Sequence, residues 1–173
     1  MIRRAGPADL AGIARVHVQA WCESYPELLP QAAIDARSIE TRIGQWRGTL
    51  AEPNGPTFVF VAERDGAICG FGSAGNIRWT GLSTGSEVSA LYLLDAVKRR
   101  GIGRMLFVRL LGELAARGFT STGLWVLTQN EPARRFYEAM GGRAGATRVQ
   151  HHGEYPLDEI AYVWDDLGAF ALM

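Results

Sequence analysis

Apolar positions repeat along the chain with two periods, one typical of helices and the other of strands. Spacings of three and four residues favour amphipathic helices, and we expect them at 10–21, 35–50, 103–116 and 133–140. Runs rich in β-branched and aromatic residues favour strands, and we expect these at 2–4, 57–62, 67–75, 87–94, 122–127, 144–150 and 159–164. This order of elements predicts an α/β fold, with helices on both faces of a mixed central sheet of about six to seven strands.

The connections are predicted from turn-forming residues. Asp65-Gly66 favours a tight hairpin turn, and Arg117-Gly118 resembles the end of a helix. Residues 76–85 are rich in glycine and serine and are expected to form a loop. The segment between the last two strands is expected to be a long turn.

Length and composition exclude several classes of protein. The chain has 173 residues, 47% of them hydrophobic, and a formal net charge of zero. One domain spanning 1–173 is expected, and a broad nucleic-acid or polybasic membrane surface is not. No apolar segment follows the N-terminus as in a signal peptide, and no apolar run approaches the roughly 18 residues of a membrane span.

The two cysteines, Cys22 and Cys69, lack the spacing of metal ligands and fit free thiols in a reducing cytoplasm. His151, His152 and Glu154 lie in a segment expected to be a turn and lack a fourth ligand nearby. We therefore expect a cytoplasmic protein without a metal.

The stretch "VKRRGIGRML" (97–106) places three basic residues before Gly101 and Gly103, at the start of a predicted helix. Backbone N–H groups and the helix dipole at such a start attract phosphate. Glycine lets the ligand approach closely, and arginine adds charge. A solvated run of charges before an ordinary helix explains the same residues, so the stretch alone leaves both interpretations open.

Two known phosphate motifs are absent from this stretch. A P-loop requires Gly-x-x-x-x-Gly-Lys-Ser/Thr. A dinucleotide fingerprint requires a small residue three positions after Gly103, where the chain has Leu106.

A second segment, "NEPARRFYEAMGG" (130–142), follows. Together with "ALYLLDAVKRRGIGRML" it resembles the GNAT superfamily of N-acetyltransferases over most of the chain. The family's Gln/Arg-x-x-Gly-x-Gly/Ala signature is read as Lys98 to Gly103, with lysine at its first position. The family's Asn-x-x-Ala-x-x-x-Tyr segment is matched by Asn130, Ala133 and Tyr137.

The resemblance implies a GNAT-like fold, acetyl-CoA as the cofactor, and direct attack of an amine on the thioester. It places the diphosphate on a loop and the pantetheine arm on the strand before that loop, whose backbone N–H groups also stabilise the oxyanion. The implied cofactor-binding residues are Leu91, Tyr92, Leu93, Lys98, Arg99, Arg100, Gly101, Ile102, Gly103, Arg104 and Asn130.

Tyr137 matches the family's general-acid tyrosine. A phenol ordinarily has a pKa of about 10, so it stays protonated at neutral pH and can donate to the departing thiolate. The alternative is a core tyrosine on an apolar helix face. Asn130 fits a helix cap, pantetheine binding, or both.

An alkylammonium must lose a proton before it attacks. Glu87, at the start of the central strand, is the expected base, acting through water; the alternative is a surface carboxylate. Glu63 and Asp95 are weaker candidates.

His17, Trp21 and Tyr25 lie on the first helix and its exit, which in this family often wall the acceptor pocket. Core packing fits Trp21 equally well, and a local hydrogen bond fits His17. The carboxylates Glu23, Glu27 and Asp35 are too scattered to predict a polycation site.

The expected activity is acetylation of a primary amine on a small molecule or a peptide. The alternative from another class is a non-catalytic acyl-CoA binding or sensing module. Many proteins that resemble this one are dimers, so we expect a homodimer paired near Trp164 and Phe170.

Overall fold

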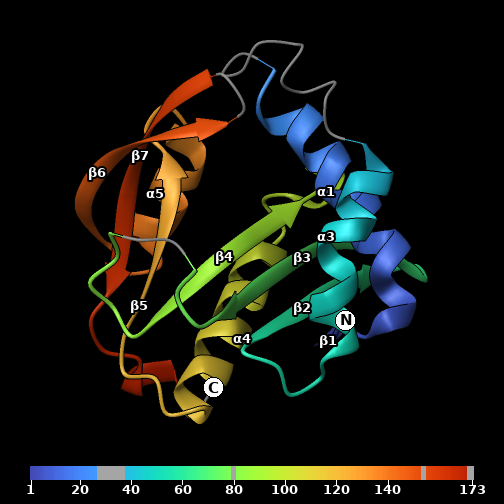
Figure 1. The fold of residues 1–173 in the computed structure, drawn as a ribbon, viewed down its shortest axis with the longest axis horizontal. Helices are drawn as coiled ribbons and strands as arrows, with labels where there is room; N and C mark the ends of the chain where they lie inside the picture. The colour runs from blue at the N-terminus through green and yellow to red at the C-terminus, as the bar shows by residue number, and fades with distance from the viewer. Residues whose placement is uncertain (27–37, 79–80, 153–154, 171–173) are drawn as a thin grey trace. The chain divides into compact units, whose positions relative to one another are not determined.

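The computed structural model describes residues 1–26, 38–78, 81–152 and 155–170 (Figure 1). Among these residues seven strands are hydrogen-bonded in the order β1-β2-β3-β4-β5-β7-β6, with parallel and antiparallel pairs. The predicted α/β fold with a mixed sheet is confirmed. The described residues form two compact units, and both β4 (Ser86–Leu93) and α4 (Ile102–Ala116) contribute to each.

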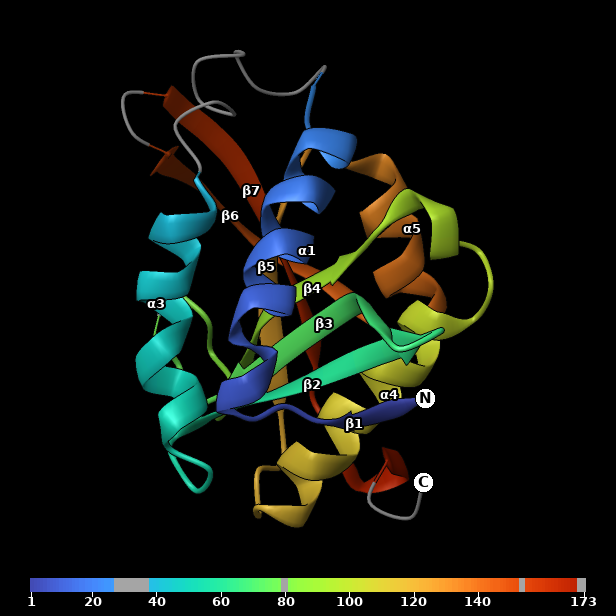
Figure 2. The ribbon, with the colours of Figure 1, turned by 90° about the vertical axis from the view of Figure 1, so that its right-hand side faces the viewer.

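Unit 1 comprises residues 1–74 and 90–110. It contains β1 (Ile2–Arg4), β2 (Thr57–Arg64), most of β3 (Ala67–Gly75) and the second half of β4. In Figure 2, α1 (Leu10–Ser24) and α3 (Ile39–Ala51) lie on one side of these strands, and α4 lies on the other.

The core of unit 1 forms where α1 and α3 meet the sheet. Its buried side chains come from both helices and from β2 and β3: Ile13, Val16, Trp46, Leu50, Val59, Val61, Ile68 and Phe71. Burying one such large side chain contributes about 1.5–3 kcal/mol. On the opposite face, Gly70 and Gly72 leave room for Leu106 and Leu110 of α4: a Cβ at Gly72 would lie 2.7 Å from Leu110 Cδ1. These contacts fix the helix whose start carries the basic loop.

The predicted second helix begins later than expected. Ser38 caps α3 by accepting a hydrogen bond from the Thr41 N–H at 3.1 Å. The expected residues 35–37 lie outside the described residues, as do Glu27, Glu154 and residues 79–80 of the expected loop.

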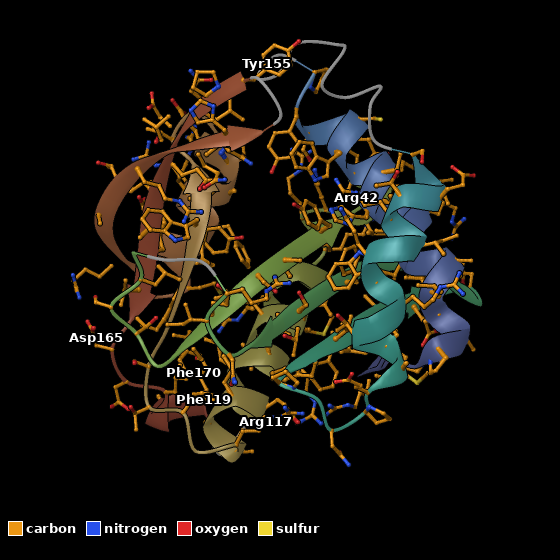
Figure 3. All side chains as sticks on the ribbon, viewed as in Figure 1. Arg42, Arg117, Phe119, Tyr155, Asp165 and Phe170 are labelled. Carbon is orange, nitrogen blue, oxygen red and sulfur yellow. The ribbon has the colours of Figure 1, made fainter. Side chains whose placement is uncertain are left out.

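Unit 2 comprises residues 75–89 and 111–173. Its strands are the first half of β4, then β5 (Thr122–Leu127), β7 (Tyr155–Trp164) and β6 (Arg143–His152). Figure 1 shows these last three strands beside α5 (Glu131–Ala139). Arg117, Phe119 and Phe170 lie close to the end of α4 (Figure 3).

One expectation for unit 2 is wrong. The described residues of the expected long turn, 151–152 and 155–158, are instead paired strand, with His151 in β6 opposite Pro156 in β7. Trp164 is buried at 4% exposure and its indole N–H donates to the Met140 carbonyl at 2.9 Å. Trp164 therefore packs within its own unit, and the expected homodimer stays a prediction.

Asp9 before α1 provides a test of the unit 1 fold. Arg3 donates to both of its carboxylate oxygens, at 2.7 and 2.8 Å, and the Gly6 N–H donates at 2.9 Å. The bonds from Arg3, aided by the Gly6 bond, hold the pKa of Asp9 below its usual value.

We expect Asp9→Asn to lower the free energy of unfolding at pH 7 by about 1–2 kcal/mol. A carboxylate with a lowered folded-state pKa stabilises the fold above its unfolded-state pKa, and this contribution is lost as the pH falls through the folded-state value. The difference in free energy of unfolding between wild type and variant, measured by urea titration, should therefore become smaller at acidic pH. A difference in free energy of unfolding that is the same at pH 7 and pH 3 would contradict this explanation.

Candidate active site

The basic loop forms an exposed cradle at the N-terminus of α4. Arg99, Arg100, Gly101 and Arg104 are all exposed. The first hydrogen bond of the helix runs from the Met105 N–H to the Gly101 carbonyl at 3.0 Å. The N–H groups of residues 102–104 therefore come before the first N–H group that bonds along the helix. N–H groups at this place in a helix can bind an anion.

The backbone of the loop is shaped for close approach. Arg99 has φ 59° and Gly101 has φ 80°, both in the left-handed region. Such alternation turns successive N–H groups toward one side and makes a concave anion site. A Cβ added at Gly101 would meet no atom within 4 Å, so open space adjoins the backbone there. A non-glycine residue at positive φ, as at Arg99, is uncommon and concentrates at functional sites.

Lys98 is bound to neighbouring residues. Its ammonium lies 2.6 Å from Asp95 Oδ1 and 3.1 Å from Ser24 Oγ. The Asp95 N–H in turn donates to Glu23 Oε2 at 2.7 Å. Lys98 thus connects the loop to the end of α1. This contact explains a lysine at the first position of the motif, and no contact with phosphate is needed to explain it.

The strand residues expected to hold the pantetheine arm alternate between two faces of unit 1. Leu91 and Leu93 lie on the α4 face, near the positions that a Cβ at Gly72 and Gly70 would take. Tyr92 lies on the opposite face against the α1 and α3 core. Their side chains therefore serve packing, as expected, and a role in cofactor binding rests on their backbone.

Three residues expected to bind the acceptor form one aromatic cluster with Tyr92. The His17 ring stacks on Tyr92 at 4.7 Å. The Trp21 indole N–H donates to the Tyr92 hydroxyl at 3.1 Å, and the Trp21 ring lies 4.4 Å from that of Tyr25. His17 is buried, and its Nδ1 accepts a hydrogen bond from Trp46 at 3.0 Å. His17 thus has a hydrogen-bond partner, but it is on α3, 29 residues away, and not local as expected. Tyr25 is the most exposed of the three.

Tyr137 is buried at 8% exposure on the inner face of α5. Its ring lies 6.0 Å from Tyr162 and 6.1 Å from Trp164, both on β7. Gly142 allows this approach, because a Cβ there would lie 2.6 Å from Trp164 Cζ2. Aromatic packing thus fixes the position of the Tyr137 ring. A general acid requires such a fixed position, and a tyrosine that only packs in the core would have it too.

Asn130 caps α5. Its side-chain oxygen accepts from the Ala133 N–H at 3.2 Å, which confirms the capping role. Pro132 lies in the first turn, where its missing N–H costs nothing.

Glu87 is buried at 2% exposure, so it is not a surface carboxylate. Its Oε1 accepts from Arg78 Nε at 2.8 Å. Arg78 is half exposed, in the loop between β3 and β4. The sequence reading missed Arg78; the signal available was an isolated arginine in a glycine-rich loop nine residues before the predicted base.

Within unit 2, the strand registers place Glu87 and Tyr137 on opposite faces of the sheet. Glu87 pairs with Gly123 on β5, and Gly123 pairs with Val163 on β7. These three residues therefore lie on the same face of the sheet. Tyr162 and Trp164, against which Tyr137 packs, alternate with Val163 and point the other way.

Trp125 shares the face of Glu87, because it lies two residues after Gly123 on β5. The Arg148 guanidinium lies 4.1 Å above its ring and pairs with Glu159 at 2.7 Å. The Trp125 indole nitrogen is buried and has no hydrogen-bond partner in the described part of the chain. The sequence reading also missed these three residues, since they meet through strand pairing alone.

The other candidate residues are bound elsewhere. Glu63 pairs with Arg3 at 3.0 Å, and Asp95 pairs with Lys98. Within the described ranges no group of three His, Cys, Asp or Glu side chains is placed to hold a metal ion. Nor does any helix in those ranges have the length and apolar character to cross a membrane.

Comparison with known proteins identifies the family of this chain. Residues 16–142 match the model of the acetyltransferase (GNAT) family. The chain is 31% identical to the uncharacterized N-acetyltransferase YuaI of Bacillus subtilis, over 97% of this chain and 94% of that one. It is 25% identical to phosphinothricin N-acetyltransferase of Streptomyces viridochromogenes, over 96% and 84% of the two chains. The fold is similar to that of PaiA N-acetyltransferase from Thermoplasma acidophilum in complex with coenzyme A, with a TM-score of 0.73, 18% identity, and coverage of 92% and 96%.

The family match and the relatives define an acyltransferase that uses a coenzyme A thioester. The chain belongs to the GNAT family of acetyltransferases. Its cofactor is acetyl-CoA and its reaction is the transfer of the acetyl group to an amine. The open, left-handed backbone at Gly101 fits the diphosphate of that cofactor.

Proposed function

We propose that this protein acetylates the primary amine of a small molecule by direct attack, with Glu87 as the base and Tyr137 as the general acid. The observation that carries this proposal is that both side chains are buried and fixed: Glu87 by the hydrogen bond from Arg78, and the Tyr137 ring by Tyr162 and Trp164. One relative, phosphinothricin N-acetyltransferase, is named for its substrate, and this name supports a small acceptor.

Acetyl-CoA supplies an activated acyl group with a thiolate leaving group. The backbone N–H groups of residues 99–104 bind its diphosphate, and the exposed arginines of the loop neutralise its charge. The backbone of residues 91–93 orients the pantetheine arm. Glu87 accepts a proton from the acceptor ammonium through water, and the Tyr137 hydroxyl donates a proton to the departing sulfur.

Arg78 fixes the carboxylate of Glu87 by its hydrogen bond to Oε1. Tyr25, beside Trp21, provides part of the acceptor wall. The exposed thiol of Cys22 and the buried thiol of Cys69 are both free, which supports a reducing, cytoplasmic setting.

A panel assay of thiol release from acetyl-CoA tests the proposal. The panel contains amino acids, phosphinothricin, arylalkylamines, polyamines and peptides with free N-termini. We expect release with a small primary amine and none with peptides. Release with peptides alone would contradict the small acceptor. Tight acetyl-CoA binding without release for any amine would favour a binding or sensing module.

Glu87→Gln tests the base. The amide cannot accept the proton, so we expect turnover at pH 7 to fall about tenfold. Because a fraction of the amine loses its proton unaided at higher pH, the loss should shrink as the pH rises toward 9. A pH-rate profile of both enzymes measures this, and a deficit that is constant across pH would assign Glu87 to structure.

A further inference from the structure

Tyr162 on β7 is a fully buried tyrosine whose hydroxyl is bound to α5. It donates to Glu138 Oε1 by a short hydrogen bond of 2.5 Å. Arg134 Nε donates to the same hydroxyl oxygen at 3.4 Å. Arg134 and Glu138 lie three residues before and one residue after Tyr137. The Tyr162 hydroxyl therefore contacts α5 on both sides of the proposed general acid.

α5 depends on such contacts for its position. It has nine residues, and isolated helices shorter than about 12–15 residues are marginal in water. Tyr162 and Trp164 hydrogen-bond β7 to α5 and its C-cap, and Trp164 does so by donating to the Met140 carbonyl. The Trp164 bond holds the end of the helix, and the Tyr162 bonds hold the turn that carries Tyr137.

We propose that Tyr162 is a positioning residue for acetyl transfer: its hydroxyl, bound to Glu138 and Arg134, sets the rotation of α5 and so the place of the Tyr137 hydroxyl. This inference rests on the proposed role of Tyr137 as the general acid. Nothing in it requires Tyr162 to touch the cofactor or the acceptor.

A small rotation of α5 has a large kinetic effect. Proton transfer in the transition state requires hydrogen-bond distance to the departing sulfur, and a displacement of about 1 Å can cost on the order of a hundredfold in rate. Burial and the bond to Glu138 raise the pKa of Tyr162 above its ordinary value. Tyr162 therefore stays protonated as a donor over the pH range in which the enzyme is assayed.

Tyr162→Phe tests the proposal, because it removes the hydroxyl and keeps the ring that packs on Tyr137. We expect turnover to fall about tenfold, with acetyl-CoA affinity near wild type. The matched control is Tyr155→Phe, which removes a hydroxyl from the same strand at its other end (Figure 3). The control should keep wild-type turnover.

A double-mutant cycle distinguishes positioning from general structural damage. If Tyr162 acts through Tyr137, then Tyr162→Phe should change turnover less than twofold when Tyr137 is already phenylalanine. An equal tenfold loss in both backgrounds would overturn the proposal, as would wild-type turnover of the single variant. Wild-type turnover of Tyr137→Phe itself would instead refute the proposed function on which the inference rests.

Glu138→Ala covers the case in which Tyr162→Phe folds poorly. It removes the partner of the Tyr162 hydroxyl from the exposed side of α5 and leaves β7 unchanged. We expect the same fall in turnover at unchanged acetyl-CoA affinity, again absent in the Tyr137→Phe background. A loss that persists in that background would overturn the proposal.

Discussion

Tyr137→Phe should lower turnover about a hundredfold, and at least tenfold, while acetyl-CoA affinity stays near wild type. The substitution removes the proton donor and keeps the ring that packs against Tyr162 and Trp164. General acid catalysis is worth on the order of a hundredfold or more. Because the hydroxyl assists only as the thiolate departs, its loss lowers turnover without weakening ground-state binding.

Steady-state kinetics with the amine found in the panel assay, together with calorimetry of acetyl-CoA binding, measures this split. Unchanged turnover would mean that water protonates the thiolate and that Tyr137 serves packing. A joint fall of affinity and melting temperature would mean that the hydroxyl supports the fold, since Tyr137 is buried.

The sequence predicted the parts of the site that depend on local chemistry. Asn130 lies just before a predicted helix, and an asparagine at that place favours the cap that the structure contains. Gly101 follows a basic run at a helix start, and the structure gives it the left-handed conformation that glycine tolerates best. Both features are set by residues a few positions apart, so a reading along the chain finds them.

Features that arise from strand pairing could not be predicted in the same way. Tyr162 and Glu138 are 24 residues apart and meet because β7 lies under α5. Arg148 reaches Trp125 across β7, and no local pattern relates them. Such contacts depend on register, and a shift of one residue would turn each side chain to the other face.

The start of β7 shows why a strand was mistaken for a turn. Pro156 lies within it, and proline ordinarily argues against a strand because it lacks an N–H. Its partner His151 lies in β6, which is the last strand in the order of the sheet. Near the free end of an edge pair the missing donor costs little, so the strand continues through a residue that sequence rules count against it.

Gly103→Val should weaken acetyl-CoA binding about a hundredfold. Gly103 is the second residue of α4 and lies among the N–H groups that precede the first intrahelical donor. A Cβ on a helix points toward its N-terminus, so the branched side chain of valine would enter the space that the diphosphate requires. Hydrogen bonds to charged groups contribute about 1.5–3 kcal/mol each, and the loss of one or two accounts for the expected factor.

The control must separate this steric effect from the low helix propensity of valine. Met105→Val provides it, because Met105 lies two residues further along the same helix and its side chain is 53% exposed. Both variants place a β-branched residue in the first turns of α4, with a similar cost in helix stability. Calorimetry should then show near wild-type affinity for Met105→Val and a large loss for Gly103→Val. Equal acetyl-CoA affinities for the two folded variants would show that the diphosphate does not bind this loop. Binding there requires that the ligand can approach the backbone at Gly103, and it does not depend on the side chain of Met105.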